Sequence, residues 1–273
     1  MVYIPVSIKR TPIFIELSFY DLPNELREHT ENDLRTRDYK LESDMRAKRV
    51  LIDYALCNDW DYFYTITLDE TKVGDRTDVD RLVKKLRQYF KNFKVRTDND
   101  LKYILIIEPH YKLEDNGKYA IHFHGLIKLN EAHKDNNPLG FPVDEFNNYI
   151  LDHYYDKHGN KVMYMESPKI KKSFGINTFT AIYNSNEFLS YYISKYITKM
   201  DLKNIKTSQR YYKSKGLSVP VRDTYSHHSL FAKKFIDLGL APSYQNKFVV
   251  KYKFTEQEFK ELENQLGEKI ELW

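Results

Sequence analysis

The stretch KYAIHFHGLIKL, residues 118–129, decides the fold because it sorts its side chains along a β-strand. Successive side chains of a strand point to opposite faces of the sheet, so His122 and His124 share one face. The other face carries apolar side chains that can pack on a core, namely Ile121, Phe123 and Ile127. An isolated pair of this kind is more often two hydrogen-bonded surface histidines than a metal site. The rest of the chain must therefore decide between these interpretations.

Length and composition place the chain among folded proteins without disulfides. Its 273 residues can hold one large domain or two small ones, and 41% hydrophobic residues can form a sizeable core. A single cysteine, Cys57, excludes an internal disulfide framework and fits a reducing cytosol. The N-terminus lacks the pattern of a signal peptide, and no apolar run approaches the length of about 18 residues that a membrane span needs. We therefore expect a cytoplasmic protein without a membrane contact.

Positive charge is concentrated in residues 160–222. This stretch holds twelve Lys and Arg against three Asp and Glu, whereas the net charge of the whole chain is only +4. Aromatic residues, mostly tyrosines, are interleaved with these basic groups. Basic groups neutralise phosphates and aromatic rings stack on unpaired bases, so the mixture is typical of single-stranded nucleic-acid binding. A solvated basic surface explains the charge equally well.

Apolar periodicity predicts six elements in the order β-α-β-β-α-β. This is the split pattern of α+β domains with a ferredoxin-like or RRM-like fold, in which two helices back one face of an antiparallel sheet. The third strand then lies between the first and the second. The predicted elements occupy residues 62–68, 75–93, 102–108, 118–129, 142–154 and 173–182.

We expect three segments along the chain. An N-terminal extension, residues 1–57, contains a strand and a helix at 41–57, and the core domain follows at 58–215. A C-terminal extension, residues 216–273, contains a strand and a last helix that starts at the capping box of Thr255 and Glu258. The sequence leaves open whether this extension packs on the same core.

A helix after the fourth strand carries two tyrosines one turn apart. In the stretch SNEFLSYYISKYITKM, Asn184 and Glu187 resemble a capping box, and a helical projection places an apolar stripe toward the core. Tyr192 and Tyr196 are neighbours on the border of that stripe because they are spaced i, i+4. The projection adds Lys199 to this border, with Lys195 beside it, and turns Tyr191 toward solvent. Taken alone, the two aromatic rings could simply complete the edge of a core.

Glu108, at the end of the second strand, is placed beside the histidine pair by the predicted strand order. One carboxylate and two neutral imidazoles form an incomplete metal shell that leaves positions for water or a phosphate oxygen. His110 has the same strand parity as Glu108 and is a competing ligand.

Several segments between residues 46 and 220 resemble HUH endonucleases that initiate rolling-circle replication, especially those of microvirus-like phages, prophages and plasmids. FYTITLDE resembles the first motif of that family, IHFHG its histidine-hydrophobe-histidine motif, and YISKYITK its two-tyrosine motif. RAKRVLIDYALCNDWDYF and RYYKSKGLSVP also resemble segments common in such proteins. The motifs occur in the family's order and on the predicted elements.

The resemblance implies a site-specific endonuclease and strand transferase for single-stranded DNA. It implies Mg²⁺ or Mn²⁺ held by His122, His124 and Glu108. It also implies Tyr192 and Tyr196 as nucleophiles that form a 5′-phosphotyrosine link and later rejoin the strand. Lys195 and Lys199 are expected to neutralise developing charge. The additional Tyr191 departs from the family pattern and makes the choice of nucleophile ambiguous.

The expected partners are those of a replication initiator in the cytoplasm of a bacterial host. They are a single-stranded DNA origin, open or folded as a hairpin, and a host helicase and polymerase. No glycine opens a phosphate-binding G-x-x-x-x-G-K-[ST] run, so we expect no nucleotide cofactor. Alternative functions are an HUH transposase or relaxase, and a non-catalytic module that binds single-stranded nucleic acid.

Overall fold

The computed structural model groups the chain into two units. Unit 1 combines Met1–Tyr39 with Ser218–Trp273, and unit 2 is Lys40–Leu217. The structure describes residues 3–20, 39–97, 100–129, 137–156, 158–183, 186–201, 209–246, 249–267 and 270. The contacts thus put α1 (Tyr39–Leu56) almost entirely with unit 2 and combine the two chain ends in unit 1, while the three-segment division remains a prediction.

Unit 2 is built on a five-stranded antiparallel sheet with the predicted strand order. The sheet runs β8-β3-β5-β4-β9, so β5 lies between β3 and β4 as the ferredoxin-like pattern requires. The added edge strand β9 pairs with β4 and was not expected from the sequence. The strands are β3 (Tyr62–Thr67), β4 (Lys102–Leu113), β5 (Tyr119–Lys128), β8 (Asn177–Ala181) and β9 (Tyr211–Lys213).

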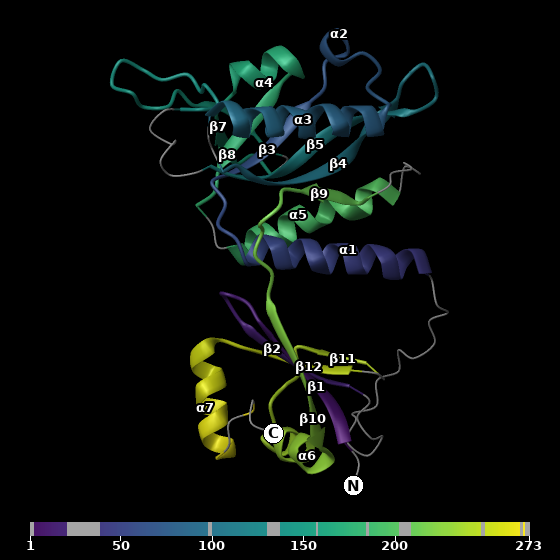
Figure 1. Ribbon diagram of the computed structural model, residues 1–273, viewed down its shortest axis with the longest axis vertical. Helices are drawn as coiled ribbons and strands as arrows, with labels where there is room; N and C mark the ends of the chain where they lie inside the picture. Colours follow the sequence, from purple (N-terminus) through teal and green to yellow (C-terminus); the bar gives the residue numbers. More distant parts are fainter. Residues whose placement is uncertain are drawn as a thin grey trace. The chain divides into compact units, whose positions relative to one another are not determined.

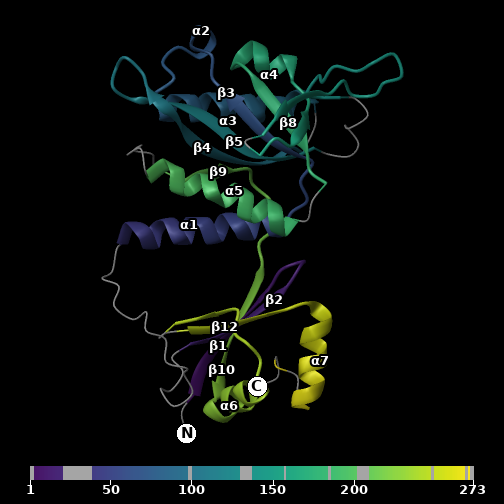
Figure 2. The same cartoon turned by 180° about the vertical axis from the view of Figure 1, so that it is seen from behind.

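Helices cover both faces of this sheet (Figures 1 and 2). One face packs on α3 (Val79–Thr97) and α4 (Pro168–Ser173), with Ile121, Phe123 and Ile127 of β5 in that core. The other face packs on α5 (Asn186–Asp201) and α1, and Ile104 and Leu126 belong to that core. The short helix α2 (Glu70–Val73) follows β3. The sheet therefore has two apolar faces, and the histidines of β5 share the face that α5 covers.

The helix predicted for residues 142–154 is wrong. This segment forms an isolated bridge between Val143 and Tyr149, and the strand β6 (Asp152–Tyr155) then pairs with β7 (Lys161–Tyr164). The side chain of Asp144 accepts hydrogen bonds from the backbone of residues 146 and 148, and Asn147 has a positive φ of 62°. Such turn chemistry competes with a helix, so the second helix of the pattern is α4.

Unit 1 contains its own five-stranded sheet, ordered β10-β1-β2-β12-β11, and two helices among its described residues. Its core has phenylalanine rings such as Phe19 and Phe235, whose centroids are 5.0 Å apart. Thr255 and Glu258 form the predicted capping box. The elements are β1 (Tyr3–Arg10), β2 (Ile15–Tyr20), β10 (Val221–His228), α6 (Ser229–Asp237), β11 (Tyr244–Gln245), β12 (Val249–Phe254) and α7 (Glu256–Leu266).

None of the helices in the described residues is both long and apolar enough to cross a membrane.

Gly125, directly after the histidine pair, is required by a close approach between β4 and β5. A Cβ atom there would lie 2.0 Å from the carbonyl oxygen of Ile104 and 2.6 Å from the Tyr64 ring. Backbone and a fully buried ring cannot move aside cheaply. We therefore expect Gly125→Ala to lower the free energy of unfolding of unit 2 by about 3 kcal/mol.

Urea unfolding followed by Trp60 fluorescence, in a Trp273→Phe background, measures this effect. The control is Gly117→Ala, where a Cβ atom meets nothing within 4 Å but φ is +71°. We expect only about 1 kcal/mol for that change. Equal effects of the two substitutions would contradict the close approach at Gly125.

Candidate functional site

Two threonines of β3 orient the two histidines of β5. Thr65 Oγ1 lies 3.0 Å from Nδ1 of His124, and Thr67 Oγ1 lies 3.1 Å from Nδ1 of His122. These pairs follow from the strand register, which sets Thr65 opposite His124 and Thr67 opposite His122. A hydrogen bond at one ring nitrogen fixes the ring and presents the other nitrogen, as is usual for metal-binding histidines. Both Nε2 atoms are thus the ones available to a ligand.

Glu108 of β4 meets His124. The carboxylate oxygen Oε2 of Glu108 lies 2.5 Å from Nε2 of His124, although Glu108 is paired with His122 in the strand register. Nε2 of His124 is buried and makes no hydrogen bond of acceptable geometry despite this short distance. A carboxylate oxygen and an imidazole nitrogen directed at the same point suit a shared cation or a shared proton.

His122 stands apart from that pair. Its ring is nearly parallel to that of His124 with centroids 6.4 Å apart, and it stacks on His110 at 5.0 Å. Burial, assisted by the neighbouring histidines, lowers the pKa of His122 to about 4, so the imidazole is neutral at pH 7.

The donor set suits a divalent metal, but the side chains are not arranged as a complete site. In the part of the chain that the structure describes, no group of three or more His, Cys, Asp and Glu is placed to hold one metal ion. Two ligands of one ion lie within about 4 Å of each other, because metal–nitrogen bonds are about 2.1 Å long. A common ion would require the rings of His122 and His124 to turn toward each other.

Helix α5 lies on the histidine face of the sheet through the predicted apolar stripe. Leu189, Ile193 and Ile197 are buried, whereas Tyr191 is 48% exposed, as the helical projection predicted. Met200 of the stripe belongs to α5, but its side chain lies outside the described part, and so does Asn184 of the predicted capping box.

Tyr196 packs directly on the histidine strand. Its ring stacks on His124 with centroids 4.3 Å apart, and its hydroxyl donates a hydrogen bond of 3.1 Å to the hydroxyl of Tyr192. Tyr196 is only 7% exposed, and burial, with Tyr192 and Glu108 nearby, raises the pKa of its phenol. Tyr192 is half-buried and packs edge-on against Phe63 of β3. The sheet and α5 thus bring the two tyrosines to Glu108 and His124.

The two predicted lysines differ in what the structure describes. Lys195 is exposed, and its ammonium group lies 5.6 Å from the centroid of the Tyr192 ring. A cation there favours negative charge near that phenol. Lys199 is part of α5, but its side chain lies outside the described part of the chain.

Sequence reasoning missed three residues of this site. Thr65 and Thr67 alternate with apolar residues in β3, so strand periodicity combined with the register of β5 could have found them. Tyr154 of β6 is the third. Burial and then the proximity of Tyr192 raise the pKa of Tyr154, which places this exposed phenol near the tyrosine pair. Its segment was predicted as a helix, so no signal pointed to it.

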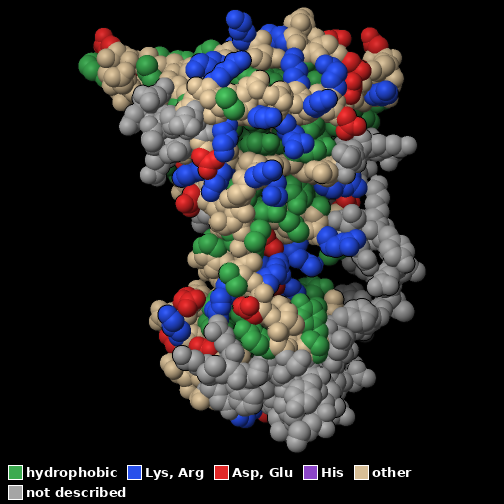
Figure 3. All heavy atoms as spheres, viewed as in Figure 1, with side chains coloured by type: hydrophobic (Ala, Val, Ile, Leu, Met, Phe, Trp, Pro, Cys, Tyr) green, Lys and Arg blue, Asp and Glu red, His purple; other side chains and the backbone are tan. Residues whose placement is uncertain are grey.

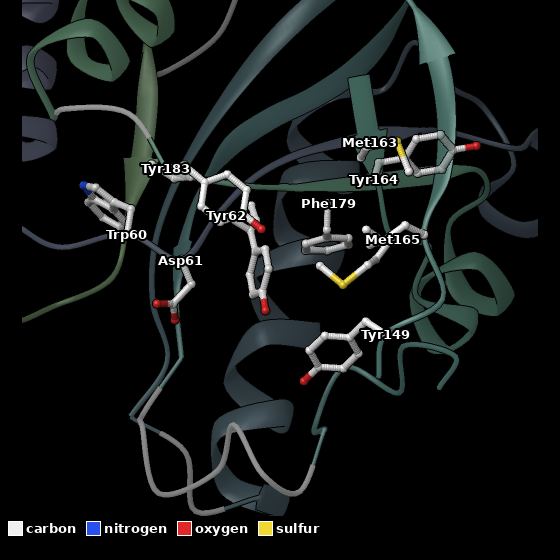
Figure 4. Close-up of a pocket in the computed structure, with 12 residues that line it drawn as sticks. Trp60, Asp61, Tyr62, Tyr149, Met163, Tyr164, Met165, Phe179 and Tyr183 are labelled. Carbon is white, nitrogen blue, oxygen red and sulfur yellow. The ribbon is translucent and has the colours of Figure 1, made fainter. Parts of the chain in front are cut away.

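A separate pocket of about 490 Å³ lies along the edge strand β8 (Figure 4). Tyr62, Phe179 and Met165 lie together in it, and Tyr149 of the bridge segment lies on its other side. None of the predicted site residues lines this pocket. Chemistry at the histidine and tyrosine residues would therefore take place outside this pocket.

Comparison with known proteins identifies one family. The sequence model of the ORF2-type replication-associated protein family matches residues 61–201. This segment runs from the start of β3 to the end of α5, so it includes every predicted site residue. No curated protein and no solved structure matches the chain.

The packing of α5 predicts different reactivities of its three tyrosines toward tetranitromethane. Tyr191 should be nitrated first and Tyr192 more slowly. Tyr196 should be the slowest, because its ring is buried and its phenol is held protonated. Peptide mapping by mass spectrometry at short reaction times measures the order, with the 92% exposed Tyr183 as internal standard. Nitration of Tyr196 as fast as that of Tyr191 would mean that the helix is rotated.

Proposed function

Because the chain belongs to the ORF2-type family of replication-associated proteins, we propose that it initiates replication by nicking single-stranded DNA at an origin. The reaction is a transesterification in which a tyrosine keeps the 5′ phosphate, and the strand is rejoined later. This makes the protein a site-specific endonuclease and strand transferase of the rolling-circle type, as the resemblance to HUH endonucleases suggests.

One observation carries this proposal: the tyrosine helix docks on the histidine strand. The Tyr196 ring stacks on His124 at 4.3 Å, and His124 in turn meets Glu108. A nucleophile pair and a candidate cation-binding group from distant parts of the sequence therefore share one small region. A module that only binds nucleic acid has no need for that arrangement.

The chemistry follows from the hydroxyl groups. In the first step the Tyr192 oxygen attacks phosphorus, the bond from phosphorus to the 3′ oxygen breaks, and the phenol proton leaves. The freed 3′ oxygen takes up a proton, and the 5′ phosphate remains as a tyrosine ester. One phosphodiester replaces another, so rejoining by attack of a 3′ hydroxyl needs no ATP.

Tyr192 is the better candidate for the first attack. It is more exposed than Tyr196, and it accepts the hydrogen bond that Tyr196 donates. That bond stabilises negative charge on the Tyr192 oxygen as its proton leaves, and Lys195 adds a nearby positive charge. Tyr196 would make the second attack, after the Tyr192 ester has formed. Lys199 is retained from the motif as a further charge-neutralising residue.

His122, His124 and Glu108 would hold Mg²⁺ or Mn²⁺, with His110 as the alternative to Glu108. A divalent ion supplies polarisation of a phosphoryl oxygen and positions the bond to be cut. Thr65 and Thr67 would keep the imidazoles in the orientation that presents Nε2. The substrate is the single-stranded DNA of an origin, open or in a hairpin. A host helicase would open the duplex and a host polymerase would extend the 3′ end.

Tyrosine substitutions test the covalent step. Wild-type protein, incubated with origin-derived single-stranded DNA and Mn²⁺, should form an adduct that is stable in denaturing gels. Tyr192→Phe should reduce adduct formation at least about 100-fold, because the general loss of a nucleophile is of that order or larger. Tyr196→Phe should leave first cleavage largely intact but impair a second cut, and the double variant should form no adduct.

The matched control is Tyr191→Phe, which removes the same group from the neighbouring exposed position. Peptide mapping of the adduct identifies the residue that carries DNA. DNA attached to Tyr191 would overturn the assignment, and the absence of any adduct with wild-type protein would favour a non-catalytic binding module.

Substitution of the ligands tests the metal. We expect His124→Ala and His122→Ala each to abolish Mn²⁺-dependent cleavage and to weaken Mn²⁺ binding in calorimetry. Thr65→Val should weaken binding about 10- to 100-fold, as loss of an orienting partner does. Glu108→Ala and His110→Ala decide the third ligand, because only the true one should alter affinity. Full cleavage by a His122→Ala, His124→Ala double variant would refute the metal site.

A further inference from the structure

A basic groove lies between α3 and the edge strand β9. It has a volume of about 580 Å³, and α3 forms one wall while β9 and the residues after it form the other. Ser214 fixes this second wall, because its backbone N–H donates to the carbonyl of Tyr103 and its hydroxyl accepts from the N–H of Tyr103. The groove is lined by Asp80, Val83, Lys84, Arg87, Gln88, Lys91, Tyr103, Tyr212, Lys213, Ser214 and Lys215.

Positive charge in this groove is not neutralised within the protein. It holds four lysines and one arginine against the single carboxylate of Asp80. Among the described residues, none forms an ion pair with Lys84, Arg87 or Lys91. In contrast, Arg81 and Lys94 on the same helix each pair with an aspartate. Figure 3 shows how densely Lys and Arg side chains gather over α3.

The three α3 cations form a row. They are spaced i, i+3, i+7, so they lie on one helix face and repel one another by a few tenths of a kcal/mol per pair. At about 1.5 Å rise per residue the row is about 10 Å long, which matches about three phosphates of one DNA strand. A polyanion would relieve this repulsion, because it supplies the missing negative charges at the same spacing.

The floor of the groove favours a phosphate backbone over unpaired bases. Its two aromatic residues, Tyr103 and Tyr212, are 9% and 6% exposed, and the guanidinium of Arg87 lies 5.6 Å from the centroid of the Tyr212 ring. Buried rings offer no stacking platform, which proteins that bind single strands normally present. A duplex keeps its bases stacked inside and presents phosphates, so duplex DNA fits the groove better.

We propose that this groove binds the phosphate backbone of double-stranded DNA, namely the paired stem of the origin. The identity of the stem rests on the proposed function, whereas the preference for duplex rests on the groove alone. Tyr103 and Glu108 are five residues apart on β4, which corresponds to about 17 Å along the strand. The groove would therefore grip a stem about five base pairs from the cleavage site. Lys215 would contact the same stem from the opposite wall.

The test is the salt dependence of binding to a DNA hairpin with a fully paired stem. The variant Lys84→Gln, Arg87→Gln, Lys91→Gln removes the row and keeps polar side chains of helical propensity. Each lost phosphate contact lowers the slope of log affinity against log salt by about 0.9, so the slope should fall by about 2.7. Between about 50 and 200 mM salt, affinity of the wild type should thus fall about 40-fold more than that of the variant.

The matched control is Lys118→Gln, Lys233→Gln, Lys260→Gln, which removes three exposed lysines outside the groove and should keep the wild-type slope. Fluorescence anisotropy is measured with the hairpin and with unpaired oligo-dT. The groove variant should bind oligo-dT within about twofold of the wild type at each salt concentration, because three groove contacts are predicted to be specific to the duplex.

Three results would overturn the proposal: an unchanged slope, an equal loss on hairpin and oligo-dT, or the same loss in the control variant. Adduct formation on a short unpaired strand separates the two hypotheses. If the wild type forms no adduct but the groove variant still loses hairpin binding selectively, the proposed nicking function fails and the groove assignment stands. If adducts form normally and hairpin binding is unaffected by the substitutions, only the groove assignment fails.

Discussion

The alternation of side chains along β5 is the constraint on which the site depends. β5 is the central strand of the unit 2 sheet, so its two faces are both covered and each must suit a different neighbour. Ile121 and Phe123 enter the core under α3, and this burial holds the strand in register. A slip by one residue would exchange the faces and turn both histidines into the apolar core, where unpaired polar groups are costly. The core on one side therefore positions the chemistry on the other.

The neighbouring strands and α5 extend this constraint. β3 supplies threonines at the same parity, β4 supplies Glu108, and α5 brings Tyr196 onto the ring of His124. Gly125 permits the close approach of Tyr64 and the β4 backbone that this packing needs. Each of these contacts joins segments far apart in the chain. The site consequently depends on the fold of unit 2 as a whole, whereas a local loop could not assemble it.

The two charged regions of unit 2 serve different needs. The tyrosine pair lies among partly buried aromatic rings, where Lys195 is an isolated nearby cation. The α3 groove has an uncompensated row of cations and a buried aromatic floor. In the functions proposed for them, the first region performs bond exchange on an unpaired strand and the second supports a paired stem without reading bases. Residues 160–222 were expected to carry the basic surface, yet the row on α3 lies outside that stretch and Lys203 and Lys206 lie outside the described residues.

Local pattern in the sequence by itself determined the elements and much of the candidate site. Period-two spacing in β5, period 3.6 in α5 and the order of strands and helices predicted the ferredoxin-like sheet, with Glu108 beside the histidines, because these features depend on neighbours along the chain. Tertiary structure alone decided the rest. The Asp144 turn replaced a predicted helix, since side-chain hydrogen bonds outweighed weak periodicity. The pairing of Thr65 with His124, the stack of Tyr196 and the α3–β9 groove need the strand register and helix packing, which no local sequence spacing specifies.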